Sequence, residues 1–222
     1  KFNYAVDFVG HPLLDAVSTI KKEDDFVQKF GLDAKPLVAI LPGSRKQEIE
    51  QMLPVMINVA KRFNDFQFVI AGAPSIEEVF YKNIIKDSSI KLISGKTYQL
   101  LLHAKAAMVT SGTATLETAL FGVPEVVCYK GGKISFMIAK QLVKVSYISL
   151  VNLILDREVV KELIQDNFNE ETLYEEMNEL LYNKEYINKV EVNYKGLREK
   201  LGGSGASEKT AQLMVSYLKG AT

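Results

Sequence analysis

From Pro36 to Tyr129, short apolar runs alternate with helical patterns, and this alternation constrains the fold more than any other feature. The runs are "PLVAIL", "FQFVIA", "IKLI", "AAMVTS" and "EVVCY". They are almost continuously apolar, which is typical of parallel strands covered on both faces. After the first run, apolar residues recur at helical spacing from Ile49 to Phe63. Five strand–helix units in series predict an α/β protein with a Rossmann-like, doubly wound parallel sheet.

The strand-like runs stop after about Leu155. The segments predicted to be successive helices are "DREVVKELIQ", "NEETLYEEMNELLYN", "KEYINKVEVNYKGLREKL" and "SEKTAQLMVSYLKG", with Asn169 and Ser204 as N-caps. We therefore expect a Rossmann-like domain over residues 1–160 and a helical C-terminal extension over residues 161–222. The opening "YAVDFVG" is predicted to be a strand without a preceding neighbour, so the chain is expected to be part of a larger protein.

The composition excludes several classes of protein. Lysine plus arginine and aspartate plus glutamate each number 27, so the formal net charge is zero and nucleic acid is not an expected partner. The single cysteine, Cys128, excludes an internal disulfide and lies in an apolar run typical of a core. No apolar run approaches the roughly 18 residues that a membrane span requires, which leaves only a peripheral membrane contact.

Small and polar residues gather where the predicted strands end. In a doubly wound sheet, ligands bind beyond the carboxyl ends of the strands. The candidate ligand-binding residues in and beside these ends are Gly43, Ser44, Arg45, Glu48, Gly72, Gly95, Lys96, Thr97, Gly112, Thr113, Ala114, Thr115 and Glu117.

The stretch "TSGTATLE" has the features of a phosphate-binding helix start. Gly112 lacks a Cβ, so a ligand can approach the backbone, and the amides of Thr113 to Thr115 would face phosphate oxygens. Glu117, one turn later, could accept hydrogen bonds from a ribose diol. In the alternative interpretation, Ser111 or Thr113 caps the helix and Glu117 completes a capping box. Neither GxGxxG nor GxxxxGK[ST] occurs, which weakens a dinucleotide or P-loop interpretation.

The stretch "LPGSRKQEIE" places Arg45 just before a predicted helix, where a positive charge opposes the helix dipole. It is either an ordinary surface arginine or a ligand for an anion, since a guanidinium can bind phosphate through two hydrogen bonds. Two phosphate sites on neighbouring loops suggest a diphosphate. With Glu117 placed for ribose, the predicted ligand is a nucleoside diphosphate or its sugar conjugate.

Five segments together resemble the lipid A disaccharide synthases of Gram-negative bacteria. They are "VDFVGHPLLD", "LPGSRKQEI", "SGTATLET", "PEVVCYK" and "LVKVSYISLVNLI", and the resemblance runs from about Val6 to Leu163. It implies a GT-B glycosyltransferase that moves 2,3-diacylglucosamine from its UDP conjugate to lipid X, 2,3-diacylglucosamine 1-phosphate, in lipid A biosynthesis. It implies neither a metal nor a redox cofactor.

The resemblance also implies that this chain is only the C-terminal, donor-binding half of such an enzyme. The acceptor site and the catalytic base would then lie in an N-terminal domain, so no catalytic residue is assigned and the fragment alone is expected to be inactive. The family is expected in the cytoplasm, peripheral on the inner membrane. An apolar stripe near the end of the chain, containing Met214 and Leu218, predicts a homodimer formed by exchange of the tail.

Carried over position by position, the resemblance assigns roles to individual residues. Gly43, Ser44 and Arg45 resemble the diphosphate side, Gly112 to Thr115 the phosphate-cradling helix start, Glu117 the ribose ligand, Gly95 to Tyr98 the loop beside uracil, and Asn152 a polar residue facing the donor. Asn152 is alternatively the N-cap of a short helix. Glu48 flanks the arginine loop. The stretch 136–147 forms either an edge for acyl chains or part of the core.

Two other functions remain open from the sequence. One is a different UDP-sugar enzyme of the same architecture, such as a peptidoglycan N-acetylglucosaminyltransferase or a UDP-N-acetylglucosamine 2-epimerase. The other is a noncatalytic α/β ligand-binding module. The enzymes predict a preference for UDP over ADP or GDP, whereas the module predicts no preference among nucleotides.

Overall fold

The computed structural model describes residues 6–86, 89–131 and 146–220. The stretch considered as an edge for acyl chains, 136–147, therefore lies almost wholly outside the described residues. Within the described ranges, no helix is both long enough and apolar enough to cross a membrane.

Six parallel strands form one sheet in the order β3-β2-β1-β4-β5-β6. The strands are β1 (Leu37–Leu41), β2 (Gln67–Gly72), β3 (Lys91–Ser94), β4 (Ala104–Thr110), β5 (Glu125–Tyr129) and β6 (Glu162–Ile164). In the register of β1, Ala39 pairs with Val69 of β2 on one side and with Ala107 of β4 on the other. The chain thus winds outward from β1 in both directions, which confirms the predicted doubly wound, Rossmann-like sheet. Strands β1 to β5 occupy the five apolar runs.

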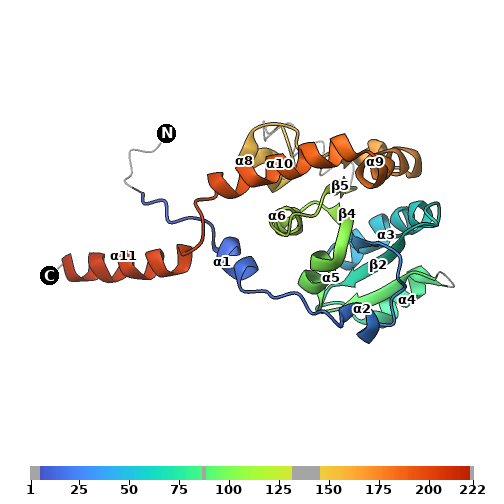
Figure 1. Cartoon of the computed structure of the whole chain (residues 1–222), viewed down its shortest axis with the longest axis horizontal. Helices are drawn as coiled ribbons and strands as arrows, with labels where there is room; N and C mark the ends of the chain where they lie inside the picture. Colours follow the sequence, from blue (N-terminus) through green and yellow to red (C-terminus); the bar gives the residue numbers. More distant parts are fainter. Residues whose placement is uncertain (1–5, 87–88, 132–145, 221–222) are drawn as a thin grey trace.

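Helices cover both faces of the sheet (Figure 1). Val38 and Ile40 of β1 face a core shared with α3 (Lys46–Ala60), α4 (Glu78–Ile85) and α9 (Glu170–Tyr182). The alternate residues of β1 face a second core, with α2 and α5, and a third cluster beside it contains α1, α6, α8 and α10. These helices span Pro12–Ser18 (α1), Phe26–Lys29 (α2), Thr97–His103 (α5), Thr113–Leu120 (α6), Leu150–Leu155 (α8) and Lys184–Lys200 (α10).

The helical pattern after β1 is confirmed by burial. Ile49, Met52, Leu53 and Met56 of α3 are all inaccessible to solvent and pack on the sheet. Burying an aliphatic side chain of this size contributes roughly 1.5–3 kcal/mol. Docking of α3 therefore fixes the loop that precedes it, Pro42 to Arg45, at the carboxyl end of β1.

The helix predicted for "DREVVKELIQ" is wrong. Glu162–Ile164 instead forms β6, which pairs in parallel with β5 and is followed by a 3₁₀ helix, Gln165–Asn167. The open edge of β5 offers hydrogen bonds that a helix in this segment would leave unused, so tertiary pairing overrides local propensity. Residues 161–222 are therefore not entirely helical, and the division of the chain at residue 160 stays a prediction.

The strand predicted for the opening segment is also wrong where the structure describes it. Val6 to Gly10 have no regular secondary structure, and no described strand lies beside them to supply a ladder. The segment lies against the tail instead: the tyrosine hydroxyl of Tyr217 donates to Asp7, and a Cβ on Gly202 would lie 2.8 Å from the Phe8 ring.

The last helix, α11 (Ala206–Gly220), extends away from the sheet and its layers (Figure 1). Asn169 caps α9 as predicted, since its side chain accepts from the amides of Glu171 and Thr172. Ser204 does not cap α11, which begins two residues later. The amides of Gly205 and Ser207 at that start donate instead to Asp15 of α1, at 2.5 and 3.0 Å.

Candidate functional site

A cleft of about 480 Å³ lies at the carboxyl ends of β1, β2 and β4. It brings together nine of the predicted residues: Gly43, Ser44, Arg45, Glu48, Thr97, Gly112, Thr113, Ala114 and Glu117. These nine residues follow β1, β3 and β4, and the end of β2 adds Ala71, Ala73 and Pro74 to the lining. The cleft therefore lies where ligands bind in doubly wound sheets.

A second hollow of about 430 Å³ adjoins the cleft and shares Pro74, Thr97 and Glu117 with it. It contains the predicted Gly95 and Lys96, together with Tyr98. Gly95 has a φ of +69°, in the left-handed region that glycine adopts readily because it lacks a side chain. Lys96 forms an ion pair with Glu23 at 3.2 Å, so its ammonium group is already engaged beside the hollow.

The start of α6 forms one wall of the cleft. Gly112 is the N-cap, and no side chain caps this helix, so the capping interpretation of Ser111, Thr113 and Glu117 is wrong. No described atom lies within 4 Å of a Cβ built on Gly112, so the space above this backbone is open. Thr115 is different: it is buried, and both its amide and its hydroxyl donate to the Gly112 carbonyl. The exposed beginning of the helix is therefore Gly112 to Ala114.

Thr110, the last residue of β4, also lines the cleft and was not singled out from the sequence. Its side chain is 5% exposed, and its hydroxyl has no hydrogen-bond partner among the described residues. A buried unpaired hydroxyl costs about 1–3 kcal/mol, so a polar partner at this position would be stabilising. In the sequence, the one feature that could have identified Thr110 as a site residue is its position as a polar residue at the end of an otherwise apolar run.

Glu117 is held by Tyr98 of α5. The Tyr98 hydroxyl donates to Glu117 Oε1 at 2.9 Å, and the Tyr98 ring packs on Phe121 with centroids 5.1 Å apart. Burial, and then the hydrogen bond to Glu117, raise the pKa of Tyr98 to about 12. Tyr98 is thus a donor throughout the neutral range. It fixes the orientation of the carboxylate that lies between the cleft and the second hollow.

The Arg45 loop also lines the cleft. Glu48 Oε1 accepts from the Arg45 guanidinium at 2.7 Å, and Glu48 Oε2 accepts from the amides of Ser44 and Arg45 at 3.2 and 3.3 Å. Gly43 has a φ of +113°, and a Cβ there would lie 2.8 Å from Glu48 Oε2, so this glycine is required for the close approach of Glu48. The Arg45 side chain is 81% exposed, so most of its surface is accessible to a ligand.

Gly72 does not line either hollow. A Cβ on Gly72 would lie 2.6 Å from the Ser94 hydroxyl and 3.1 Å from a Leu92 methyl group. The glycine therefore allows β2 to pack against β3. Its predicted contact with the ligand is not supported by its position.

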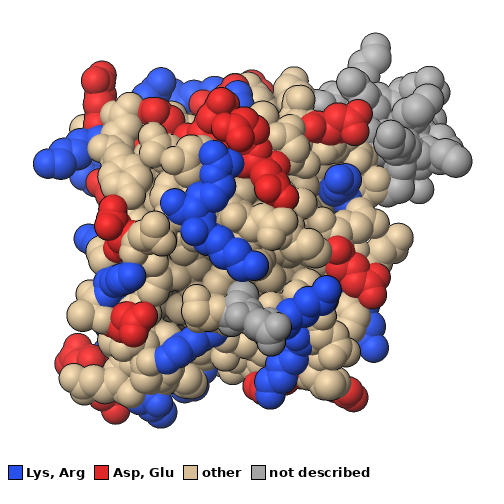
Figure 2. All heavy atoms as spheres, turned by 90° about the vertical axis from the view of Figure 1, so that its right-hand side faces the viewer, with Lys and Arg blue, Asp and Glu red and all other residues tan. Residues whose placement is uncertain are grey.

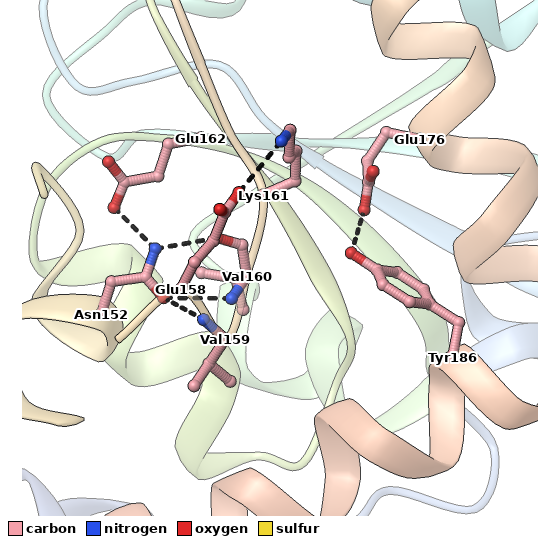
Figure 3. Close-up of polar contacts among 8 residues, drawn as sticks. All are labelled: Asn152, Glu158, Val159, Val160, Lys161, Glu162, Glu176 and Tyr186. Atoms are coloured by element: carbon pink, nitrogen blue, oxygen red, sulfur yellow. Dashed lines mark hydrogen bonds and ion pairs between the residues drawn. The ribbon is translucent and has the colours of Figure 1, made fainter. Parts of the chain in front are cut away.

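Asn152 is not at the site either, contrary to both interpretations of its role. It is fully buried, and its amide nitrogen donates to the Val160 carbonyl at 2.8 Å and to Glu162 at 2.9 Å (Figure 3). Its amide oxygen accepts from the amides of Val159 and Val160 at 2.7 and 3.0 Å. The N-cap of α8 is Ser149, not Asn152. Asn152 and Glu162 thus fasten α8 to β6, and both donor hydrogens and the acceptor oxygen of the Asn152 amide are used within the protein.

Within the described residues, no group of three or more histidine, cysteine, aspartate or glutamate side chains is arranged to hold a metal ion. What the cleft presents is an arginine, the open start of α6 and an oriented carboxylate. This combination suits an anionic ligand that also carries hydroxyl groups.

The fold and this cleft define a class: a Rossmann-like α/β domain of the GT-B type. S. aureus MnaA, solved together with UDP, superposes with a TM-score of 0.67 at 16% identity, over 99% of this chain and 55% of that one. A putative UDP-N-acetylglucosamine 2-epimerase from Listeria monocytogenes superposes with a TM-score of 0.60 at 17% identity, over 95% and 53% of the two chains. At this level of identity, these likenesses show the fold alone.

The chain belongs to the lipid-A-disaccharide synthase family. The family model described as lipid-A-disaccharide synthetase matches residues 1–216. The lipid-A-disaccharide synthase of Syntrophus aciditrophicus is 38% identical over 96% of this chain and 58% of its own length, and that of Geobacter sulfurreducens is 33% identical over 96% and 57%. The chain therefore spans somewhat more than half the length of these relatives.

Proposed function

We propose that this chain is the donor-binding part of a lipid-A-disaccharide synthase. The whole enzyme would transfer 2,3-diacylglucosamine from its UDP conjugate to lipid X in lipid A biosynthesis. The observation that supports this most strongly is the single cleft that unites the Arg45 loop, the open start of α6 and the Tyr98-held Glu117. Family membership supports the choice of donor.

Each part of the cleft has a role in this proposal. Arg45 and the amides at the start of α6 bind the diphosphate, Glu117 accepts from the ribose hydroxyls, and the hollow at Gly95 to Tyr98 receives uracil. During transfer, negative charge develops on the departing UDP. A guanidinium and a helix N-terminus aimed at that charge would stabilise the transition state. No catalytic base is assigned within the chain.

The acceptor substrate, the catalytic base and the membrane contact concern the whole enzyme and not this chain alone. Glycosyl transfer requires the acceptor and its base to be held against the donor. We assign both to an N-terminal domain, in keeping with the 58% of the relative's length that this chain covers. The chain by itself is then expected to form no disaccharide. The protein would work in the cytoplasm, peripherally on the inner membrane that carries its lipid substrates.

A UDP-N-acetylglucosamine 2-epimerase activity is the main alternative, because solved structures with that description share the fold. A peptidoglycan-type transferase would bind the same nucleotide. A noncatalytic module would bind UDP, ADP and GDP alike. Calorimetric titration of this chain with the three nucleotides therefore separates the enzymes from the module.

The same titration tests the assigned residues. A hydrogen bond to a charged group contributes about 1.5–3 kcal/mol, so Arg45→Ala should weaken UDP binding about tenfold or more. Glu117→Gln should weaken UDP much more than 2′,3′-dideoxy-UDP, which lacks the ribose diol. Equal affinity for all three nucleotides, or UDP affinities unchanged in both variants, would contradict the proposal.

A further inference from the structure

One carboxylate, that of Glu48, satisfies three donors of the arginine loop at once. Its two oxygens accept from the Arg45 guanidinium and from the amides of Ser44 and Arg45, at 2.7 to 3.3 Å. Backbone amides next to a guanidinium form the kind of donor set that binds a phosphate group. Here a side chain of the protein supplies the anion.

Glu48 lies where it can affect binding of a ligand in the cleft. Glu48 lines the same cleft as Arg45 and Gly112, and its side chain is 27% exposed, so its charge faces any ligand that enters. A carboxylate and a phosphate group compete for the same amide hydrogens. Two anions held beside the same donors also repel each other. A diphosphate that reaches these donors must displace the carboxylate or share Arg45 with it.

We infer that Glu48 is a specificity-determining residue that competes with the phosphate groups of the ligand for the Arg45 loop. This deepens the proposed function, on which it rests. Because the competitor is tethered, only a ligand with enough negative charge displaces it, and the carboxylate can return to its place as UDP leaves. Glu48 thus lowers the affinity for the diphosphate and favours release of the product.

A simpler role for Glu48 is helix capping, because it is the third residue of α3 and accepts from the amide of the N-cap residue, Arg45. Glutamine serves equally well in that role. Glu48→Gln therefore keeps one acceptor oxygen for the cap amides, and replaces the charged oxygen that accepts from Arg45 with an uncharged amide group. The two roles predict different results for this variant: capping alone predicts an unchanged UDP affinity, whereas competition predicts tighter binding.

The test is calorimetric titration of UDP into the whole 222-residue chain, its Glu48→Gln variant and a matched control, Glu50→Gln. Glu50 is an exposed glutamate two residues further along α3, so the control removes the same charge outside the cleft. We expect Glu48→Gln to bind UDP about five- to tenfold more tightly, because Arg45 and the amides no longer hold a charged partner. Glu50→Gln should match the unmodified chain within about twofold.

Two further measurements make the result specific. Binding of uridine, which carries no phosphate, should not differ between Glu48→Gln and the unmodified chain. In an Arg45→Ala background, Glu48→Gln should tighten UDP much less. UDP affinity that is unchanged or weaker in Glu48→Gln, while the unmodified chain binds UDP, would overturn this inference and leave the proposed function standing. Absence of UDP binding by the unmodified chain would overturn both.

Discussion

At the scale of single residues, the site depends on groups that orient other groups. The Tyr98 hydroxyl donates to the Glu117 carboxylate, and this hydrogen bond orients the carboxylate. Glu48 does the same for Arg45. Sequence motifs identified the groups expected to touch the ligand. The orienting contacts became visible only when residues from different loops were placed side by side.

We expect Tyr98→Phe to weaken UDP binding several-fold. The variant keeps the ring that packs on Phe121 and removes the hydroxyl that holds Glu117, and a hydrogen bond to such a charged group contributes about 1.5–3 kcal/mol. The loss should be much smaller for 2′,3′-dideoxy-UDP, which cannot use Glu117. Equal weakening for both ligands would show that Tyr98 acts on some other part of the nucleotide.

Glu125, the first residue of β5, makes a prediction about stability. It is fully buried, neither carboxyl oxygen has a partner among the described residues, and burial raises its pKa well above the usual value. In the unfolded chain this carboxyl ionises near its ordinary pKa of 4.5, whereas in the folded chain it stays protonated to higher pH. Stability should therefore fall as pH rises through that interval.

Glu125→Met should remove this dependence and stabilise the chain at pH 7 by about 1–3 kcal/mol, since an unsatisfied buried polar group is replaced by an apolar one. Urea unfolding at pH 5 and pH 8 would measure it. The difference in stability between the variant and the unmodified chain should grow with pH. A difference that is the same at both pH values would show that Glu125 finds a charge-stabilising partner.

At the scale of secondary-structure elements, the carboxyl ends of the strands determine which predictions succeed. Strands β1 to β5 were predictable because each is a nearly unbroken apolar run. The meeting of Arg45, Gly112 and Glu117 followed, because parallel strands bring their carboxyl ends to one edge. Burial along α3 followed from its helical spacing.

Strand β6 could not be predicted, because it depends on contacts with residues outside its own short segment. Its neighbour β5 supplies the ladder, and Asn152 binds the two valine amides just before it (Figure 3). The predicted ligand contact of Gly72 has a related explanation. A glycine at a strand end allows close approach either of a ligand or of a neighbouring strand, and only the position of Ser94 distinguishes the two.

Asn152→Ala tests this account of α8 and β6. It leaves the amides of Val159 and Val160 without their acceptor and the Val160 carbonyl without a donor, at about 1–3 kcal/mol for each buried group left unpaired. We expect the free energy of unfolding to fall by about 3 kcal/mol or more, with UDP affinity of the folded protein little changed. A large loss of UDP affinity with normal stability would place Asn152 at the donor after all.

At the scale of the whole molecule, positive and negative charges balance, whereas exposed apolar side chains are concentrated on the last helix, α11. Figure 2 shows basic and acidic side chains interspersed on one face of the molecule. Among the ion pairs, Arg62, two residues after α3, pairs with Glu171 of α9 at 3.2 Å. The tail is different: Met214, Tyr217 and Leu218 of α11 are 63%, 62% and 74% exposed, and Ala206 is the only buried residue of that helix. Such a face normally has a partner.

We propose that two copies of this chain exchange α11, with the glycine-rich segment 202–205 as the hinge. Light scattering coupled to size exclusion should then show a dimer at high concentration. Met214→Ser combined with Leu218→Ser should shift the population toward monomer, as should ending the chain at Gly202. A monomer at high concentration, unchanged by either alteration, would contradict exchange.

The central claim is that one cleft binds the diphosphate of UDP between the Arg45 loop and the start of α6. The most direct measurement is a crystal structure of this chain with UDP bound. We expect diphosphate oxygens within hydrogen-bond distance of the Arg45 guanidinium and of the amides near Thr113, with a ribose hydroxyl on Glu117. A well-ordered UDP whose diphosphate contacts neither Arg45 nor the start of α6 would contradict the claim.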